Sequence, residues 1–222
     1  MPNKAVIWDM DGVIADTAPY HFKAWQGVFR KQDIDFTEAD FRRNFGQRND
    51  TIIRKTLGKD TSPAEIEAIA TEKEENFRQS VKNSVKPLPG AVKLLKSLRE
   101  YGFSVALASS APIANIQLVT RELDIENCFQ VVISGREVTE GKPSPQGFLL
   151  AAEKLGVKPQ NCVVIEDAIA GVRAAKRAGM HCLAVTNTNP EISLAEADLV
   201  VDTLETLNVA DLAGLFNSTK ES

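Results

Sequence analysis

The chain has 222 residues, of which 43% are hydrophobic and 25% are charged, a balance typical of a globular protein that is large enough to bury its own core. A formal net charge of −4 argues against a nucleic-acid or anionic-membrane surface, but not against a local basic pocket for a small anion. No apolar run approaches the roughly 18 residues of a membrane span, and no signal-peptide pattern opens the chain, so we expect a cytoplasmic protein. The cysteines, Cys128, Cys162 and Cys182, are odd in number and far apart, which favours buried free thiols over disulfides or a zinc site.

The first element in the chain is a short apolar run, residues 5–8. It predicts a buried parallel strand, because it lacks polar alternation and ends abruptly at acidic residues. Asp9 and Asp11 follow this strand, and Gly12 allows a turn. The carboxyl end of a parallel strand faces the ligand crevice of an open α/β sheet, so we expect both carboxylates to point into solvent, where a substrate can reach them. The alternative is an ordinary turn, since Asp and Gly are common turn formers.

Residues 17–86 show helical patterns and no strand pattern. Apolar side chains recur at helical spacing from residue 20 to residue 29, and further helices are predicted over residues 38–45, 50–57 and 63–82. Ser62 is predicted to cap the last of these helices, with Pro63 in its first turn. The prolines and the glycine of residues 86–90 mark a boundary. We therefore predict a helical domain of residues 17–86 inserted into a core domain of residues 1–16 and 87–222.

Strands and helices alternate after that boundary. Further strands are predicted over residues 103–108, 131–134, 162–165, 181–185 and 198–201, and helices over residues 91–101, 113–123, 145–155, 168–178 and 204–216. This alternation predicts parallel pairing with right-handed crossovers. The fold class is therefore α/β, a doubly wound, mainly parallel Rossmann-like core with a helical cap domain inserted after the first strand. Residues 218–222 are predicted to be disordered.

Polar side chains stand at the ends of several predicted strands. Ser109 and the pair Glu166 and Asp167 each follow a strand, and Lys142 lies in a proline-rich loop before a helix. In a doubly wound sheet these segments converge with Asp9 on one crevice. Together they offer carboxylates for Mg²⁺, a hydroxyl and an ammonium for phosphate oxygens, and a carboxylate that can attack phosphorus.

Each of these residues also has an ordinary structural interpretation. Ser109 could serve only a turn or a helix cap, the acidic pair could complement a helix N-terminus, and Lys142 could be a solvated loop charge. Their occurrence together, in this order along the chain, favours the chemical interpretation.

The order and content of these motifs resemble the haloacid dehalogenase superfamily of phosphohydrolases. The four matching stretches are residues 9–17, 108–110, 141–143 and 165–168, and the likeness covers essentially the whole chain. The helical insertion resembles the small cap of the branch that contains β-phosphoglucomutase and sugar phosphatases.

The resemblance implies a role for each motif in phosphoryl transfer, and the chemistry of the residues agrees. Asp9 would attack phosphorus and form an aspartyl-phosphate, while Asp11 would act first as general acid and then as general base. Ser109 and Lys142 would hold the transferring phosphoryl group. An acid at Asp11 disfavours the dehalogenase branch, because a displaced halide needs no proton.

The resemblance also implies Mg²⁺ as the cofactor. Its ligands would be the Asp9 carboxylate, the Asp11 backbone carbonyl and the Asp167 carboxylate, with Glu166 bound directly or through water. So few protein ligands suit Mg²⁺, which keeps several waters and shares phosphate oxygens with a substrate.

Substrate choice is expected to come from the cap. His21, Gly46 and Arg48 are predicted to bind the substrate together with Ser110 of the core. The alternative for His21 is a partly exposed residue on an ordinary helix face. The mutase carries a lysine immediately before the glycine of this cap loop and an arginine three residues after it, whereas this chain has Phe45 before Gly46 and Arg48 two residues after it.

We therefore expect a Mg²⁺-dependent phosphatase that acts on a small phosphorylated metabolite, most simply a sugar phosphate, through an aspartyl-phosphate. The alternative is β-phosphoglucomutase, in which a sugar hydroxyl attacks the aspartyl-phosphate in place of water. A metabolite-binding module without activity would predict a broken nucleophile or metal site, and Asp9, Asp11 and Asp167 are all present. No nucleic-acid or membrane partner is expected, and a monomer is the default for this cap type.

Overall fold

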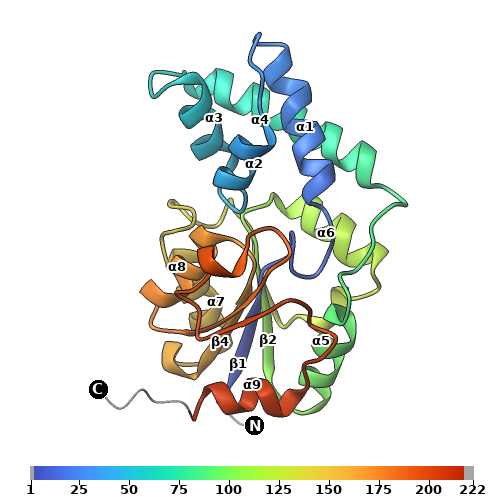
Figure 1. The fold of residues 1–222 in the computed structure, drawn as a ribbon, viewed down its shortest axis with the longest axis vertical. Coiled ribbons are helices and arrows are strands. Elements are labelled where there is room, and N and C mark those ends of the chain that lie inside the picture. The colour runs from blue at the N-terminus through green and yellow to red at the C-terminus, as the bar shows by residue number, and fades with distance from the viewer. Residues whose placement is uncertain (1–2, 218–222) are drawn as a thin grey trace.

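The computed structural model describes residues 3–217, and its centre is a parallel β-sheet (Figure 1). The six strands of the described residues lie in the order β3-β2-β1-β4-β5-β6, and every neighbouring pair is parallel. They are β1 (Ala5–Trp8), β2 (Ser104–Ala108), β3 (Val131–Ile133), β4 (Cys162–Glu166), β5 (His181–Val185) and β6 (Leu199–Val201). Because β1 lies between β2 and β4, the carboxyl ends of these three strands adjoin.

Helices cover both faces of the sheet. Alternate residues of β1 point to opposite faces: Val6 and Trp8 join one buried cluster, and Ala5 and Ile7 join the other. The first cluster is covered by α5 (Ala91–Glu100), α6 (Ile113–Glu122) and α9 (Val209–Leu215), and the second by α7 (Gln146–Leu155) and α8 (Ile169–Arg177). The described part of the core domain also contains three short 3-10 helices, η1 (Glu126–Cys128), η2 (Pro159–Asn161) and η3 (Glu191–Ser193). The predicted fold class is confirmed.

The last helix begins later than predicted. We expected it to start at Leu204, but α9 starts at Val209 because Asn208 forms a capping box there. The Asn208 side chain accepts a hydrogen bond from the backbone N–H of Ala210, and the Asn208 backbone N–H donates to the Asp211 carboxylate. These two hydrogen bonds fix the first turn of the helix. The predicted disordered segment, residues 218–222, lies outside the described residues.

Four helices between β1 and α5 form a separate layer beyond the carboxyl edge of the sheet, at the top of Figure 1. They are α1 (Ala18–Arg30), α2 (Glu38–Asn44), α3 (Asn49–Leu57) and α4 (Pro63–Val81). Ser62 caps α4 as predicted, because its hydroxyl accepts a hydrogen bond from the backbone N–H of Glu65 at 3.2 Å. Aromatic and branched aliphatic side chains, among them Trp25, Phe29 and Ile53, form a core inside this layer. We call these four helices and their loops the cap.

The two chain segments that join the cap to the core lie side by side. Ala15 forms an antiparallel bridge with Pro87, and the Asp16 N–H donates a hydrogen bond to the Lys86 carbonyl at 3.1 Å. The domain boundaries at residues 16/17 and 86/87 stay a prediction, and this pairing is where we place them.

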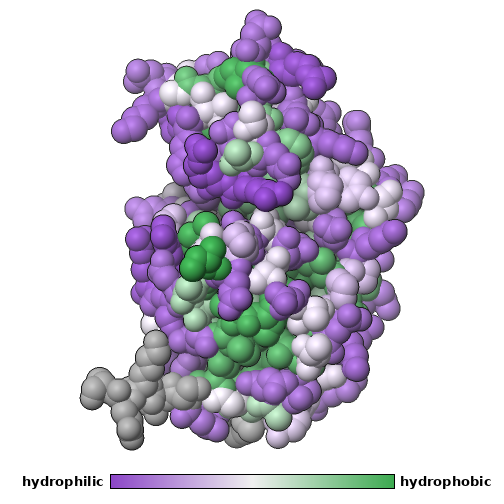
Figure 2. All heavy atoms as spheres, in the orientation of Figure 1, coloured by the Kyte–Doolittle hydropathy of each residue, from purple (hydrophilic) through white to green (hydrophobic). Residues whose placement is uncertain are grey.

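The surface and the cysteines agree with the composition. Hydrophilic side chains dominate the face in Figure 2, and apolar atoms gather mainly over its lower half, in front of the sheet. Within residues 3–217, no helix combines the length and the apolar character that crossing a membrane requires. Cys128, Cys162 and Cys182 are buried and free, as predicted.

Candidate active site

The sheet brings the predicted strand-end residues together. Asp9 directly follows β1, and its N–H donates a hydrogen bond to the carbonyl of Ile165 in β4 at 3.0 Å. Ser109 directly follows β2, and Glu166 and Asp167 stand at the end of β4. Because β1 pairs with both β2 and β4, these three strand ends meet at one point.

Lys142 reaches this point from the loop before α7. Its ammonium forms an ion pair with Oδ1 of Asp9 and another with Oε1 of Glu166, the latter at 2.5 Å. Burial lowers the pKa of Lys142, but the two carboxylates outweigh that effect and raise it above its ordinary value. Lys142 therefore stays charged. The interpretation of Lys142 as a solvated loop charge is wrong, because its side chain is only 9% exposed.

The acidic residues around Lys142 have the chemistry of a divalent cation site. Asp9, Glu166 and Asp167 are buried, and one carboxylate oxygen of each lies within 4.8 Å of the others. Burial raises the pKa of Asp9 to about 7 against the opposing effect of Lys142, and burial together with Glu166 raises the pKa of Asp167 well above its usual range. One ammonium does not balance this negative charge, and a bound Mg²⁺ would.

The oxygens of the acidic residues differ in how far the protein satisfies them. Oε1 of Glu166 pairs with Lys142, and Oε2 accepts hydrogen bonds from the backbone N–H groups of Asp167 and Ala168 at 2.9 Å each. Oδ1 of Asp167 is buried and has no hydrogen-bond partner within the described residues. Because buried polar atoms are nearly always paired, Asp167 is the strongest candidate for direct contact with a cation.

Asp11 faces the cavity beside Asp9, in contact with the start of the cap. Its Oδ1 accepts a hydrogen bond from the Thr17 hydroxyl at 2.6 Å and lies 3.1 Å from Nε2 of His21. Burial raises the pKa of Asp11, but His21, Thr17 and Lys73 outweigh it, so the pKa is lowered. Oδ2 of Asp11 accepts no hydrogen bond from the described part of the chain and is available for proton transfer.

His21 is held from both sides. It is 6% exposed, so the alternative of a partly exposed helix residue is wrong. Its ring stacks on Phe77 with the centroids 3.8 Å apart, and its Nδ1 lies 2.9 Å from Nζ of Lys73. An ammonium can only donate a hydrogen bond, so Nδ1 accepts from Lys73 and Nε2–H donates to Asp11.

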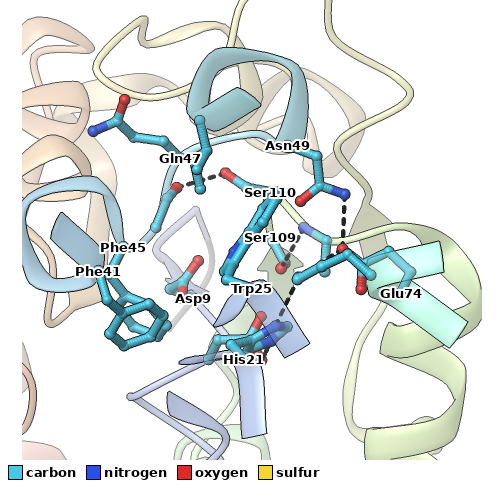
Figure 3. Close-up of a pocket in the computed structure, with 15 residues that line it drawn as sticks. Asp9, His21, Trp25, Phe41, Phe45, Gln47, Asn49, Glu74, Ser109 and Ser110 are labelled. Carbon is cyan, nitrogen blue, oxygen red and sulfur yellow. Dashed lines mark hydrogen bonds and ion pairs between the residues drawn. The ribbon is translucent and has the colours of Figure 1, made fainter. Parts of the chain in front are cut away.

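The cap closes over these residues and leaves a small cavity between cap and core (Figure 3). Trp25, Phe41 and Phe45 of the cap line it opposite Asp9 and Ser109 of the core. Its volume of about 40 Å³ holds only a few water molecules. The expectation that both carboxylates point into solvent is therefore wrong for Asp9, which is 4% exposed because the cap covers it. We infer that the cap must move to admit a substrate.

The loop between α2 and α3 carries the predicted substrate-binding residues of the cap. The carbonyl of Gly46 accepts a hydrogen bond from the Ser110 hydroxyl at 2.7 Å, and both residues line the cavity. Arg48 lies outside it, beside a second cavity of about 350 Å³. The Arg48 guanidinium donates to the carbonyl of Val138 in the core and pairs with Asp50 at 3.2 Å. A substrate contact by Arg48 stays a prediction.

Comparison with known proteins identifies the family. A model of haloacid dehalogenase-like hydrolases matches residues 3–179. The chain belongs to this family. It is 36% identical to β-phosphoglucomutase of Bacillus subtilis over 205 residues, which cover 89% of this chain and 88% of that protein. It is 35% identical over 214 residues to a phosphatase of phosphorylated carbohydrates from Thermotoga maritima. The match covers 93% of this chain and 97% of that protein. A crystal structure of β-phosphoglucomutase from Clostridium difficile matches with a TM-score of 0.87 at 30% identity. The match covers 96% of this chain and 97% of the chain in that structure. The predicted family and enzyme class are confirmed.

In this haloacid dehalogenase-like hydrolase, sequence reasoning missed a buried ion pair in the cap. Lys73 and Glu74 are 2% and 4% exposed, and Nζ of Lys73 lies 2.8 Å from Oε1 of Glu74. The Asn49 amide donates to Oε1 of Glu74 at 2.8 Å, and the Asn115 amide of the core donates to Oε2 at 2.6 Å. Burial opposes the charge on Glu74, but Lys73 and His21 outweigh it and lower the pKa of Glu74.

The sequence does contain one sign of this ion pair. Residues 72–75 are all charged, which is typical of a solvated helix surface. Lys73 nevertheless stands four residues after Ile69 and four before Phe77, in line with the buried stripe of α4. A lysine in an apolar stripe needs a buried partner, and the hydrolase provides Glu74 and His21.

Proposed function

We propose that this chain is a Mg²⁺-dependent phosphatase that hydrolyses a small phosphorylated carbohydrate through an aspartyl-phosphate on Asp9. The observation that carries the proposal is the buried ion pair of Lys142 with Asp9, because Asp9 lines, together with Asp11, the cavity that the cap closes. Relatives named as a phosphatase of phosphorylated carbohydrates and as a fructose-1-phosphate phosphatase, at 35% and 34% identity, support the substrate class.

The first half of the reaction would form the aspartyl-phosphate. A carboxylate oxygen of Asp9 attacks phosphorus, and the bond from phosphorus to the ester oxygen breaks. Asp11 must be protonated for this step, which its lowered pKa opposes, and it gives that proton to the departing alkoxide. The Lys142 ammonium, which is paired with Asp9, and the Ser109 hydroxyl, which lines the same cavity as Asp9, would stabilise the negative charge of the phosphoryl oxygens.

The second half would release phosphate. Asp11, now ionised, takes a proton from water, and the water oxygen attacks phosphorus and frees the Asp9 carboxylate. The Asp11 pKa, lowered mainly by His21, suits this basic role. The closed cap excludes other water from the reacting groups.

Mg²⁺ would be held by Asp9, by Asp167 and by the Asp11 backbone carbonyl, with Glu166 bound directly or through water. The unpartnered Oδ1 of Asp167 and the excess of buried carboxylates support this assignment. When bound, the ion would supply positive charge that draws the phosphate and the Asp9 carboxylate together.

β-Phosphoglucomutase activity is the second candidate. The likeness to the Bacillus subtilis enzyme favours it, as does the contact of His21 with Asp11. A mutase must also hold a second phosphate, since its intermediate is a bisphosphate. Among the described residues that line the cavity, Lys73 is the only lysine or arginine, and Glu74 already neutralises it. This favours hydrolysis.

³¹P NMR of the purified protein with Mg²⁺ and a panel of phosphosugars, including β-glucose 1-phosphate, separates the two candidates. We expect inorganic phosphate to accumulate, to stop on addition of EDTA and to be absent with the Asp9→Asn variant. Glucose 6-phosphate without inorganic phosphate would favour the mutase. Neither product from any member of the panel would overturn the proposed substrate class.

A further inference from the structure

Asp167 is held by a loop that none of the sequence motifs includes. This loop, residues 186–190, follows β5 and lies beside the end of β4, because the two strands pair. The Thr188 hydroxyl donates a hydrogen bond to Oδ2 of Asp167. The Asn189 amide donates to the backbone carbonyl of Asp167 at 3.0 Å. Two adjacent loop residues therefore fix both the side chain and the backbone of Asp167.

Gly12 encloses the same oxygen from another direction. Its φ is +84°, and a Cβ atom there would overlap Oδ2 of Asp167 and lie 2.9 Å from the Thr188 hydroxyl oxygen. The turn after Asp11 thus needs glycine for its backbone conformation and for the close approach to Asp167. Oδ2 is walled in by the Gly12 backbone and the Thr188 side chain.

The other oxygen of Asp167 is left without a protein partner. Oδ1 is buried and accepts no hydrogen bond from residues 3–217, and Asp167 belongs to the group of three acidic residues, with Asp9 and Glu166, that bring one carboxylate oxygen each within 4.8 Å of the others. In the Asp167 carboxylate, Oδ2 thus accepts a hydrogen bond from Thr188, whereas Oδ1 remains available to a cation.

We propose that Thr188 is a positioning residue that keeps Asp167 a ligand through Oδ1 alone and thereby favours Mg²⁺ over Ca²⁺. Mg²⁺ demands near-octahedral geometry with short bonds to single oxygens, whereas Ca²⁺ takes six to eight ligands and readily accepts both oxygens of one carboxylate. A hydroxyl that occupies Oδ2 withholds the second oxygen. The inference rests on the magnesium site of the proposed function.

Isothermal titration calorimetry of the whole protein with Mg²⁺ alone and with Ca²⁺ alone tests this inference. Thr188→Val keeps the side-chain shape and removes the hydrogen bond, and we expect it to weaken Mg²⁺ binding about tenfold, as loss of a hydrogen bond to a metal ligand typically does. Ca²⁺ binding should change little or improve, so the preference for Mg²⁺ should fall about tenfold. Thr188→Ser keeps the hydroxyl and should restore the preference.

Two controls separate the possible failures. Thr186→Val is the same substitution two residues away, where the hydroxyl contacts Asp202 instead, and it should leave both affinities unchanged. Asp167→Asn should lose both metals. If the wild type and Asp167→Asn titrate alike, the proposed magnesium site fails. If the wild type binds Mg²⁺ and Thr188→Val retains the same preference for Mg²⁺ over Ca²⁺, the role of Thr188 is overturned while the magnesium site stands.

Discussion

Two polar clusters, one in the core and one in the cap, are buried alike, but their charges are balanced differently. The core cluster consists of Asp9, Lys142, Glu166 and Asp167, and the cap cluster consists of His21, Lys73 and Glu74. The core cluster sets three carboxylates against one ammonium, whereas the cap cluster pairs one carboxylate directly with one ammonium, which also donates a hydrogen bond to the histidine.

The difference shows which cluster needs a further partner. Every ionised group of the cap cluster has protein partners, and Asn49 and Asn115 complete the coordination of Glu74. In the core cluster, Oδ1 of Asp167 has no hydrogen-bond partner among residues 3–217. We therefore infer that the core cluster is completed by a cation and a phosphoryl group, and that the cap cluster is complete and serves to orient Asp11.

Loss of the Asp9 nucleophile should have the largest effect on activity, and it tests whether the core cluster carries the chemistry. We expect Asp9→Asn to lower the rate of phosphate release by on the order of 10⁴-fold or more, because the substitution removes the carboxylate oxygen that attacks phosphorus. Its thermal midpoint should not fall, since burial already disfavours the ionised form of Asp9 and raises its pKa to about 7.

The control for Asp9 is the same substitution at an exposed position. Asp60→Asn, in the loop before α4, should retain full activity. Turnover by Asp9→Asn within tenfold of the wild type would refute the aspartyl-phosphate.

Breaking the buried ion pair should be the next largest effect and tests whether the cap cluster is self-contained. Lys73→Met leaves the Glu74 carboxylate buried without its cation, which typically costs about 3–5 kcal/mol in the free energy of unfolding. Lys31→Met removes a lysine from an exposed ion pair between the residue that follows α1 and Glu72 of α4, and it should cost less than about 1 kcal/mol. Urea denaturation measures both, and equal costs would show that the cap cluster contributes no more than a surface pair.

The pH dependence of stability also tests whether the cap cluster stabilises the ionised Glu74 carboxylate. The pKa of Glu74 is lowered from its ordinary value of 4.5, so the folded state binds its proton less readily than the unfolded state does. The stabilisation from the Glu74 carboxylate is therefore full above about pH 4.5 and is lost as the pH falls through the folded pKa. We expect Glu74→Gln to lower the free energy of unfolding by about 1–3 kcal/mol near pH 7.

That difference between the wild type and Glu74→Gln should shrink as the pH falls below 4.5, because the protonated glutamic acid resembles glutamine. Urea denaturation at a series of pH values measures it. Glu75→Gln, at an exposed position of the same helix, is the matched control. A difference that stays constant down to acid pH would contradict the lowered pKa.

The core could be predicted from the sequence because its determinants are local. Residues 5–8 are the whole of β1, and the residues that follow β1, β2 and β4 meet once those strands are parallel neighbours. A short range of sequence therefore decides both the strand and the position of its last carboxylate or hydroxyl. The start of α9 differs from the prediction although its determinant is also local, because the Asn208 capping box outweighs the apolar pattern that begins at Leu204.

The cap cluster and the Thr188 contact could not be predicted in the same way. Lys73 meets His21 only because α1 packs on α4, and Asn115 reaches Glu74 only because the cap has closed on α6. Thr188 is separated from Asp167 by α8 and β5. These contacts depend on helix packing and loop paths rather than on a motif, and they determine how the predicted carboxylates are held.

The smallest expected effect concerns Arg48, which lies outside both clusters and contacts the core through the Val138 carbonyl. If Arg48 contacts the substrate when the cap reopens and closes, Arg48→Ala should raise KM for phosphosugars about fivefold, or about 1 kcal/mol, and leave KM for a small aryl phosphate unchanged. If Arg48 instead only joins the cap to the core through the Val138 carbonyl, both substrates should be affected equally. Arg136→Ala, which removes an exposed arginine from the same second cavity, controls for the loss of positive charge. Steady-state kinetics with the two substrate types decide between a specificity residue and a structural contact between cap and core.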